Sequence, residues 1–323
     1  MTFEDFLEEW QDGNDFISAQ TSGSTGLPKK IRLPKTFVKE SALRTINFFG
    51  ITKGSSLHSC VSPEFIGGKM MAVRADIAGC SFSWETPSNT PFNSLSRSAT
   101  IDLAAVVPSQ MDFVVNNLQT LPKIKTFLVG GSKIPDALRL RIAESGIEAY
   151  ESYGMTETAS HIALRKVSST ALPFTTLAGI SVSTDSRGCI SIRFADSRTV
   201  TTNDLAEIYS PTQFVILGRF DNIINSGGKK INPTELESRL QEIVDAPFMI
   251  TGFPDEKWGE RVVMIVEGSG GKNQCEELLC LCKKNLPGWQ TPKEIIFVKE
   301  LPKTPNGKFI RPKDPQDLFS FGS

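Results

Sequence analysis

Residues 20–30 read Gln20-Thr21-Ser22-Gly23-Ser24-Thr25-Gly26-Leu27-Pro28-Lys29-Lys30. An apolar run from Phe16 to Ala19 precedes this stretch and Ile31-Arg32-Leu33 follows it, so we expect a polar loop between two short strands. The two glycines allow positive φ, which lets successive backbone N–H groups point inward and form an anion-binding nest. The hydroxyls and the Lys29 ammonium add donors suited to phosphate. The stretch is therefore a candidate phosphate loop, and a plain Ser/Gly surface turn is the alternative.

The order of residues in this loop is not that of a Walker loop. The pattern GxxxxGK[ST] is absent, and a strand rather than a helix is expected to follow. Any phosphate site here must therefore belong to a different class of nucleotide-binding fold.

Length and composition narrow the classes of protein that fit. The chain has 323 residues, enough for about two domains, and its 35 Lys and Arg against 36 Asp and Glu give a formal net charge of −1. That balance disfavours nucleic acid and acidic membrane surfaces as partners. No apolar run approaches the roughly 20 residues that span a bilayer. The six cysteines form no CxxC pair, so we expect reduced thiols in a cytoplasmic protein.

The pattern of apolar residues predicts an α/β fold. From residue 101 onward the order is β-α-β-α-β, with a continuous apolar strand at 101–107 that is typical of a parallel sheet covered on both faces. Residues 177–217 alternate apolar and polar positions, which predicts a small antiparallel β subdomain. Asn232-Pro233-Thr234-Glu235 predicts a helix start in a C-terminal α+β domain. We place the domains at 1–218 and 219–323.

Three later motifs join the loop. They are Tyr153-Gly154-Met155-Thr156-Glu157-Thr158, the pair Asp204 and Arg219, and Leu301-Pro302-Lys303-Thr304-Pro305-Asn306-Gly307-Lys308. With residues 21–29, which match [ST]SG[ST]TGxPK at every defined position, they resemble the four nucleotide motifs of the adenylate-forming superfamily of acyl-CoA synthetases, luciferases and peptide-synthetase adenylation domains. The motifs occur in the family's order and span nearly the whole chain.

The resemblance implies an ATP-dependent acid–thiol ligase with a large N-terminal domain and a mobile C-terminal domain. Such an enzyme uses ATP, Mg²⁺ and CoA, forms acyl-AMP and pyrophosphate, and then transfers the acyl group to CoA. The part that normally precedes the phosphate loop in the family is largely absent here, so the N-terminal domain is expected to be short.

The resemblance also assigns roles to single residues. Lys308, Glu157 and Thr156 would be catalytic, with Glu157 also holding Mg²⁺. The nucleotide would be bound by Thr21, Ser22, Gly23, Ser24, Thr25, Gly26, Lys29, Gly130, Gly131, Ser132, Glu151, Tyr153, Gly154, Met155, Asp204 and Arg219. Asp221 matches the hinge position, and Gly227, Gly228 and Lys229 would help to build the CoA tunnel.

The acyl substrate is indicated by shorter segments. Residues 107–111, 127–134, 152–160 and 223–233 look most like the o-succinylbenzoate–CoA ligases of menaquinone biosynthesis. Phe65, Gly67 and Gly68 fit the region that lines the acyl site in related ligases, with a closely packed helix start as the alternative. His161 and Arg165 are four apart and are expected to lie on one face, toward the ring carboxylate of that diacid; packing and surface charge are the alternative.

Two other functions fit the same motifs. One is a different aryl- or short-chain acyl-CoA ligase, and the other is a catalytically silent nucleotide-binding module on the same fold. The intact lysine motif at 301–308 favours an enzyme.

Overall fold

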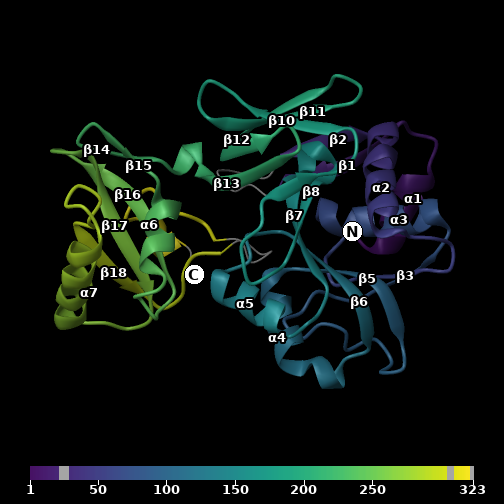
Figure 1. Ribbon diagram of the computed structural model, residues 1–323, viewed down its shortest axis with the longest axis horizontal. Coiled ribbons are helices and arrows are strands. Elements are labelled where there is room, and N and C mark those ends of the chain that lie inside the picture. Colours follow the sequence, from purple (N-terminus) through teal and green to yellow (C-terminus); the bar gives the residue numbers. More distant parts are fainter. Residues whose placement is uncertain (22–28, 304–308, 321–323) are drawn as a thin grey trace. The chain divides into compact units, whose positions relative to one another are not determined.

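The computed structural model describes residues 1–21, 29–303 and 309–320 (Figure 1). The chain forms two compact units. The first consists of Met1–Val182, Ile192–Val200 and Tyr209–Phe214. The second consists of Ser183–Ser191, Thr201–Ile208 and Val215–Ser323.

The first unit begins with a helix and a hairpin. Helix α1 (Phe3–Gln11) starts with a capping box, in which Thr2 and Asp5 satisfy each other's backbone N–H groups. Strand β1 (Phe16–Gln20) pairs antiparallel with β2 (Lys30–Pro34), as the flanking apolar runs predict. Helix α2 (Lys35–Phe49) follows directly and ends at Gly50, which has a left-handed φ of 62°.

A parallel sheet forms the centre of this unit. Strands β4 (Ser81–Trp84), β3 (Ser56–Ser59), β5 (Thr100–Val106), β6 (Lys123–Val129) and β7 (Ala149–Met155) lie in that order, each parallel to its neighbour. Helices α4 (Pro108–Asn117) and α5 (Asp136–Glu144) make the crossovers, with the short η1 (Leu118–Thr120) after α4. The predicted β-α-β-α-β order is confirmed, because three strands and two helices alternate along 100–155.

Helices cover both faces of the sheet. Phe127 and Val129 of β6 belong to the buried cluster that includes residues of α4 and α5. On the other face, the ring of Tyr150 packs edge-on against Phe48 and Phe49 of α2. Helix α3 (Ile66–Ala78) packs beside α2 and against β3, β4, β5 and β8. This arrangement explains why the parallel strands are apolar on both sides.

The sheet continues beyond β7 with antiparallel pairs. Strand β8 (Ser160–Lys166) pairs with β7, β9 (Phe174–Thr176) with β8, and β13 (Gln213–Arg219) with β9. The full order is β10-β11-β12-β13-β9-β8-β7-β6-β5-β3-β4, where β10 is Ile180–Thr184, β11 Cys189–Phe194 and β12 Thr199–Ser210. The sheet is therefore mixed, and the expected α/β class is confirmed.

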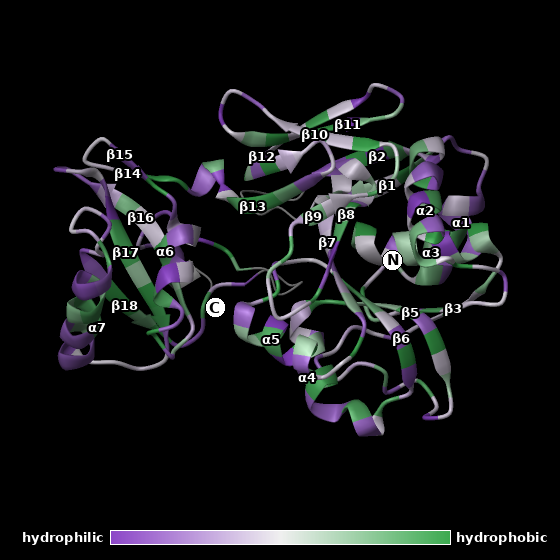
Figure 2. Ribbon diagram, in the orientation of Figure 1, coloured by the Kyte–Doolittle hydropathy of each residue, from purple (hydrophilic) through white to green (hydrophobic). Residues whose placement is uncertain are grey.

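The second unit contains its own sheet and core. Strands β15 (Lys229–Ile231), β14 (Ile224–Ser226), β17 (Gly259–Glu267) and β16 (Phe248–Asp255) lie in that order, and β18 (Glu294–Val298) is parallel to β17. Helices α6 (Pro233–Leu240) and α7 (Lys272–Asn285) pack against the apolar strands, which are green in Figure 2. The other elements are η3 (Phe220–Asn222) and α8 (Asp317–Ser320). No helix in the described part of the chain is long and apolar enough to cross a membrane.

Candidate active site

The base of the candidate phosphate loop is fixed by the β1–β2 hairpin. Thr21 N donates to Lys29 O at 2.9 Å, and Lys29 N donates to Thr21 Oγ1 at 3.0 Å. These bonds continue the ladder of the hairpin by one residue on each strand and hold the two ends of the loop together. Lys29 is exposed. The predicted phosphate ligands Ser22, Gly23, Ser24, Thr25 and Gly26 lie outside the described residues.

The second nucleotide motif lies at the end of β7. Thr156–Thr158 form a short 3₁₀ helix, η2, that is held by a bond from Met155 N to Thr158 Oγ1 of 3.0 Å. Thr156 Oγ1 donates to Gln20 O at 3.3 Å, immediately before the phosphate loop. Two motifs separated by more than a hundred residues are thus brought together at the end of a strand, where α/β sheets bind ligands.

The backbone after this motif is strained. Ala159 has a φ of 51° and Ser160 a φ of 89°, although neither is glycine. Ser41 Oγ of α2 donates to Ala159 O at 2.7 Å, and Thr158 Oγ1 donates to Ser160 O at 2.7 Å. Residues held in sparsely populated conformations cluster at functional sites, so this turn is consistent with a site at 156–160.

Glu157 and Tyr153 have different surroundings. Glu157 is exposed, and within the described residues its carboxylate has no ion-pair partner, which leaves hard oxygen ligands available to Mg²⁺. The ring of Tyr153 is half-buried and lies 5.3 Å from that of Phe214 and 5.8 Å from that of Phe174. The residues present therefore fit a nucleotide bound with Mg²⁺.

The turn at Gly130, Gly131 and Ser132 follows β6. Gly131 has a φ of 92°, and a Cβ on Gly130 would lie only 2.8 Å from Ser152 Oγ. Gly131 therefore requires glycine, and the missing side chain at Gly130 lets the turn approach Ser152 of β7, next to the second nucleotide motif.

Glu151 and Arg165 form a buried ion pair between β7 and β8. Glu151 is 4% exposed; its Oε1 accepts from Ile134 N at 3.1 Å and its Oε2 accepts from Arg165 Nε at 2.8 Å. The guanidinium also lies 4.4 Å from the centroid of the Phe174 ring. Both side chains are thus occupied within the protein, so we regard Glu151 as a positioning residue that holds the turn before α5.

The expectation that His161 and Arg165 share a face is wrong. The β7–β8 register pairs Glu151 with Arg165 and Tyr153 with Ala163, but Gly154 with His161, so it shifts by one residue. A bulge of this kind reverses the alternation of side chains along the strand. Arg165 accordingly lies on the face of Glu151, whereas His161 lies on the opposite face and contacts Thr45 Oγ1 of α2 at 3.0 Å.

The bulge is accommodated by Gly154. A Cβ at this position would lie 2.3 Å from Ser160 O and 2.4 Å from His161 Cα, distances that real side chains do not adopt. Burial, and secondarily the positive charge of Arg74, holds the pKa of His161 well below its ordinary value, so the imidazole is neutral.

Arg74 is a residue that the sequence analysis missed. It lies on α3, is 1% exposed, and makes only long polar contacts: Nη2 to Ser160 Oγ at 3.3 Å and Nη1 to Met71 Sδ at 3.6 Å. Its Nε has no hydrogen-bond partner, and no carboxylate in the described ranges forms an ion pair with it. Burial lowers the pKa of Arg74 to about 9. The available signal was an arginine that directly follows the apolar run 70–73 and precedes Ala75.

Phe65, Gly67 and Gly68 lie at the start of the same helix. Phe65 is the residue before the first turn of α3. A Cβ on Gly68 would lie 2.3 Å from Ser62 O, so this glycine permits close packing of the helix start. Close packing of the helix start is therefore enough to explain the glycine at position 68, without a role in lining the acyl site.

In the second unit, Asp204 and Arg219, the pair predicted to bind ribose, lie in contact. Arg219 Nη1 lies 3.2 Å from Asp204 Oδ1, and Arg219 Nη2 lies 2.7 Å from Asp221 Oδ2. Burial alone would raise the pKa of Asp221, but the hydrogen bonds and charge of Arg219 outweigh it and lower the pKa. The guanidinium of Arg219 thus links Asp204, the predicted ribose ligand, to Asp221, the predicted hinge residue.

The remaining predicted residues lie in or near the β14–β15 hairpin. Gly227 and Gly228 have φ of 56° and 75°, which explains the two glycines of the turn. Lys229 Nζ lies 4.6 Å from the centroid of the Trp289 ring. Lys308 lies outside the described residues.

Two models of protein families match this chain. The model described as AMP-binding enzyme matches residues 8–185, and that described as AMP-binding enzyme C-terminal domain matches residues 238–308. The chain belongs to the AMP-binding enzyme family. The family predicted from the four motifs is confirmed.

Curated members of this family are similar over most of their length. A 2-succinylbenzoate--CoA ligase of Listeria monocytogenes serotype 4b is 28% identical over 335 residues, covering 95% of this chain and 71% of that protein. A 2-succinylbenzoate--CoA ligase of Bacillus cereus strain Q1 is 26% identical, covering 90% of this chain and 68% of that protein.

Solved structures of AMP-binding enzymes share the fold. An acyl-CoA synthetase (AMP-forming)/AMP-acid ligase II-like protein from Dyadobacter fermentans is 31% identical with a TM-score of 0.61, covering 98% of this chain and 92% of that one. An O-succinylbenzoate coenzyme A synthetase from Bacillus subtilis, solved with ATP and magnesium ion, is 20% identical with a TM-score of 0.76, covering 91% and 68%.

Proposed function

We propose that this AMP-binding enzyme is an AMP-forming acid–thiol ligase that converts 2-succinylbenzoate (o-succinylbenzoate), ATP and CoA to the acyl-CoA thioester. The curated relatives with that name support the substrate. The single structural observation that carries the proposal is Arg74, a buried guanidinium beside the nucleotide motif that has no carboxylate partner among residues 1–21, 29–303 and 309–320.

The nucleotide end of the site rests on residues of the first unit. The chemistry joins a carboxylate to the α-phosphorus of ATP and expels pyrophosphate, so catalysis is mainly positioning and charge neutralisation. The loop at 21–29 would bind the outer phosphates through its backbone N–H groups and Lys29. Thr156, anchored to Gln20, would lie beside the reacting phosphate, and Glu157 would hold Mg²⁺.

The acyl end of the site rests on Arg74. A buried charge without a counter-ion is costly and is retained where a ligand supplies the opposite charge. The proposed substrate has two carboxylates, of which only the aliphatic one is activated. The ring carboxylate would accept the bidentate hydrogen bonds of Arg74, near Ser160 and the neutral imidazole of His161.

Residues of the second unit would take the roles that the family implies. Asp204 and Arg219 would bind the ribose hydroxyls, Lys308 would stabilise the charge that develops during adenylation, and Gly227, Gly228 and Lys229 would line the route of CoA. All six cysteines are free thiols, which supports a reducing compartment such as the cytoplasm.

A carboxylate panel tests the proposal. Pyrophosphate release by the full chain would be measured with ATP and Mg²⁺, with and without CoA, for o-succinylbenzoate, benzoylpropionate, benzoate and a short fatty acid. We expect the highest kcat/KM for o-succinylbenzoate and a thioester product only with CoA. Equal turnover of a monoacid would indicate another aryl- or short-chain acyl-CoA ligase. Nucleotide binding without pyrophosphate release from any acid would indicate a silent module.

A further inference from the structure

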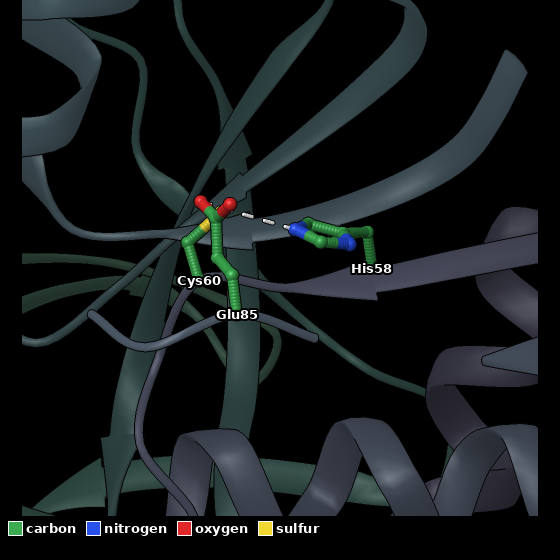
Figure 3. A group of neighbouring side chains, drawn as sticks. All are labelled: His58, Cys60 and Glu85. Carbon is green, nitrogen blue, oxygen red and sulfur yellow. Dashed lines mark ion pairs between the residues drawn. The ribbon is translucent and has the colours of Figure 1, made fainter. Parts of the chain in front are cut away.

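A second cluster of ligand-type side chains lies apart from the residues assigned above. His58, Cys60 and Glu85 each direct one ligand atom toward the others, and these atoms all lie within 4.8 Å of one another (Figure 3). His58 is 0% and Cys60 1% exposed, and the side chain of Glu85 is 9% exposed. The cluster is thus enclosed by the first unit.

The sheet register explains why these residues meet. His58 is paired with Ser83 across the parallel strands β3 and β4, and side chains two residues apart lie on the same face. Cys60 and Glu85 follow two residues later on each strand, where Glu85 N donates to Ser59 O at 3.2 Å. The three side chains therefore lie on one face at the carboxyl ends of adjacent strands.

The imidazole of His58 is oriented as a metal ligand would be. Its Nδ1 lies 2.8 Å from Ser83 Oγ, and this hydroxyl donates its only proton to Leu57 O at 3.5 Å. With this hydroxyl as the donor to Leu57, Nδ1 donates to Ser83 Oγ, and in that tautomer Nε2 carries the lone pair. Nε2 is buried and has no hydrogen-bond partner in the part of the chain that the structure describes. It lies 4.0 Å from Glu85 Oε1, which is too far for a hydrogen bond.

The carboxylate is held in place by a neighbouring loop. Glu85 Oε1 accepts from Phe92 N, and Oε2 accepts from Ser94 Oγ at 3.0 Å. Phe92 has a φ of 72° although it is not glycine, and its buried ring lies 5.5 Å from the imidazole. Oε2 also accepts from Ser94 N at 3.3 Å, so Oε1, which keeps one of its two lone pairs, is the carboxylate oxygen left for a cation.

We propose that His58 Nε2, Cys60 Sγ and Glu85 form a structural Zn²⁺ site that fastens the 85–94 loop to the ends of β3 and β4. Imidazole, thiolate and carboxylate together suit a borderline-soft dication, and the thiol disfavours Mg²⁺. Tetrahedral zinc needs ligand atoms roughly 3.3–3.8 Å apart, so a contraction of about 1 Å at most completes three of four positions. Burial and the nearby carboxylate raise the pKa of the Cys60 thiol, and a bound dication would reverse this by stabilising the thiolate.

Metal binding to the full chain tests this site independently of ligase activity. The tag-free protein would be stripped with chelator and titrated with Zn²⁺, and with Co²⁺ as a spectroscopic probe of thiolate ligation. The chain contains only two histidines, which limits competing sites. We expect one equivalent of Zn²⁺, a thiolate-to-cobalt charge-transfer band, and a raised midpoint of thermal unfolding.

Variants assign the ligands. Cys60→Ser should abolish the charge-transfer band, and Glu85→Gln should weaken Zn²⁺ binding at least about tenfold. Cys189→Ser is the matched control, because Cys189 is 0% exposed and lies outside the cluster, and it should change neither. If Cys60→Ser fails to fold, the Zn²⁺ affinity of Glu85→Gln and the Co²⁺ spectrum of the native protein show whether the cluster binds the metal. The proposal would be overturned if the native protein did not bind Zn²⁺ stoichiometrically, or if the charge-transfer band survived in Cys60→Ser. It would also be overturned if Glu85→Gln bound Zn²⁺ as tightly as the native protein, or if Cys189→Ser lost Zn²⁺ binding to the same degree as the ligand variants.

Discussion

At the residue scale, the proposed substrate preference rests on Arg74, whose role its local sequence does not reveal. It lies on α3 and is 1% exposed, yet arginine is almost never fully buried unless it is paired. In the described part of the chain it contacts a hydroxyl and a thioether, neither of which neutralises the charge. The cost of desolvating this guanidinium is therefore not repaid by the residues around it, and a bound anion would reduce it.

This cost predicts that Arg74→Met stabilises the protein in the absence of substrate. Removing a buried charged group without a partner should raise the free energy of unfolding by about 1–3 kcal/mol, as measured by urea denaturation. Arg165→Met is the matched control, because its guanidinium is paired with Glu151 and breaking a buried pair should cost about 3–5 kcal/mol. A loss of stability in Arg74→Met would mean that Arg74 is structural.

His161 predicts a dependence of stability on pH. Its pKa in the folded state is well below 6.5, while that of the unfolded chain is near the ordinary value, so the unfolded state binds the proton first as pH falls. Stability from this group is complete above about pH 6.5 and declines below it, by at most about 1.4 kcal/mol per pH unit. Unfolding of wild type and His161→Gln between pH 5 and 7 (about the range in which histidine titrates) measures the difference. Parallel curves would contradict the prediction.

At the scale of elements, the β7–β8 bulge decides which residues face the site. Without the shift, His161 and Arg165 would lie on one face; with it, they lie on opposite faces of the sheet. Arg165 then pairs with Glu151 on the side of α5, while His161 lies beside α2 and Arg74. The shift of one residue in the strand register therefore places the Glu151–Arg165 ion pair and the candidate acyl site on opposite faces of the sheet.

The bulge predicts that Gly154→Ala is poorly tolerated. The new methyl group would meet the backbone at Ser160 and His161 rather than a movable side chain. We expect a loss of about 1–3 kcal/mol in the free energy of unfolding, together with a lower kcat. Gly54→Ala is the control, because its methyl group would meet only Thr52 Oγ1 at 4.0 Å and should change little. Equal effects of the two substitutions would show that the close contact is not rigid.

Local pattern was sufficient to predict most helices and strands. The apolar run at 101–107 and the Asn232 cap correspond to β5 and α6, with Asn232 Oδ1 accepting from Thr234 N as expected. Pattern could not predict the bulge, the burial of Arg74 or the meeting of His58, Cys60 and Glu85. These depend on strand register and on packing between distant segments, which composition and periodicity do not encode.

At the scale of the whole molecule, the family implies two half-reactions that depend on different residues. Lys308→Ala should abolish formation of the acyl-adenylate but still convert supplied acyl-adenylate and CoA to thioester. Asp221→Pro should do the reverse, because proline fixes φ at the hinge candidate. Each half-reaction would be followed separately, by pyrophosphate release and by thioester formation.

Asp221→Ala is the control for the proline variant. It removes the ion pair with Arg219 while leaving the backbone free, so it should retain more thioester formation than Asp221→Pro. If Lys308→Ala and Asp221→Pro lose both half-reactions to the same degree, the roles assigned to these residues are wrong.

The central claim is that Arg74 selects a diacid in an adenylating site. The most direct measurement is the ratio of kcat/KM for o-succinylbenzoate to that for benzoylpropionate, the same acid without its ring carboxylate, in wild type and Arg74→Met. Losing a buried charged hydrogen bond of roughly 2–5 kcal/mol predicts that this ratio falls at least about 30-fold in the variant, with turnover of the monoacid little changed. A ratio that is the same in both proteins, or an equal loss for both acids, would contradict the account.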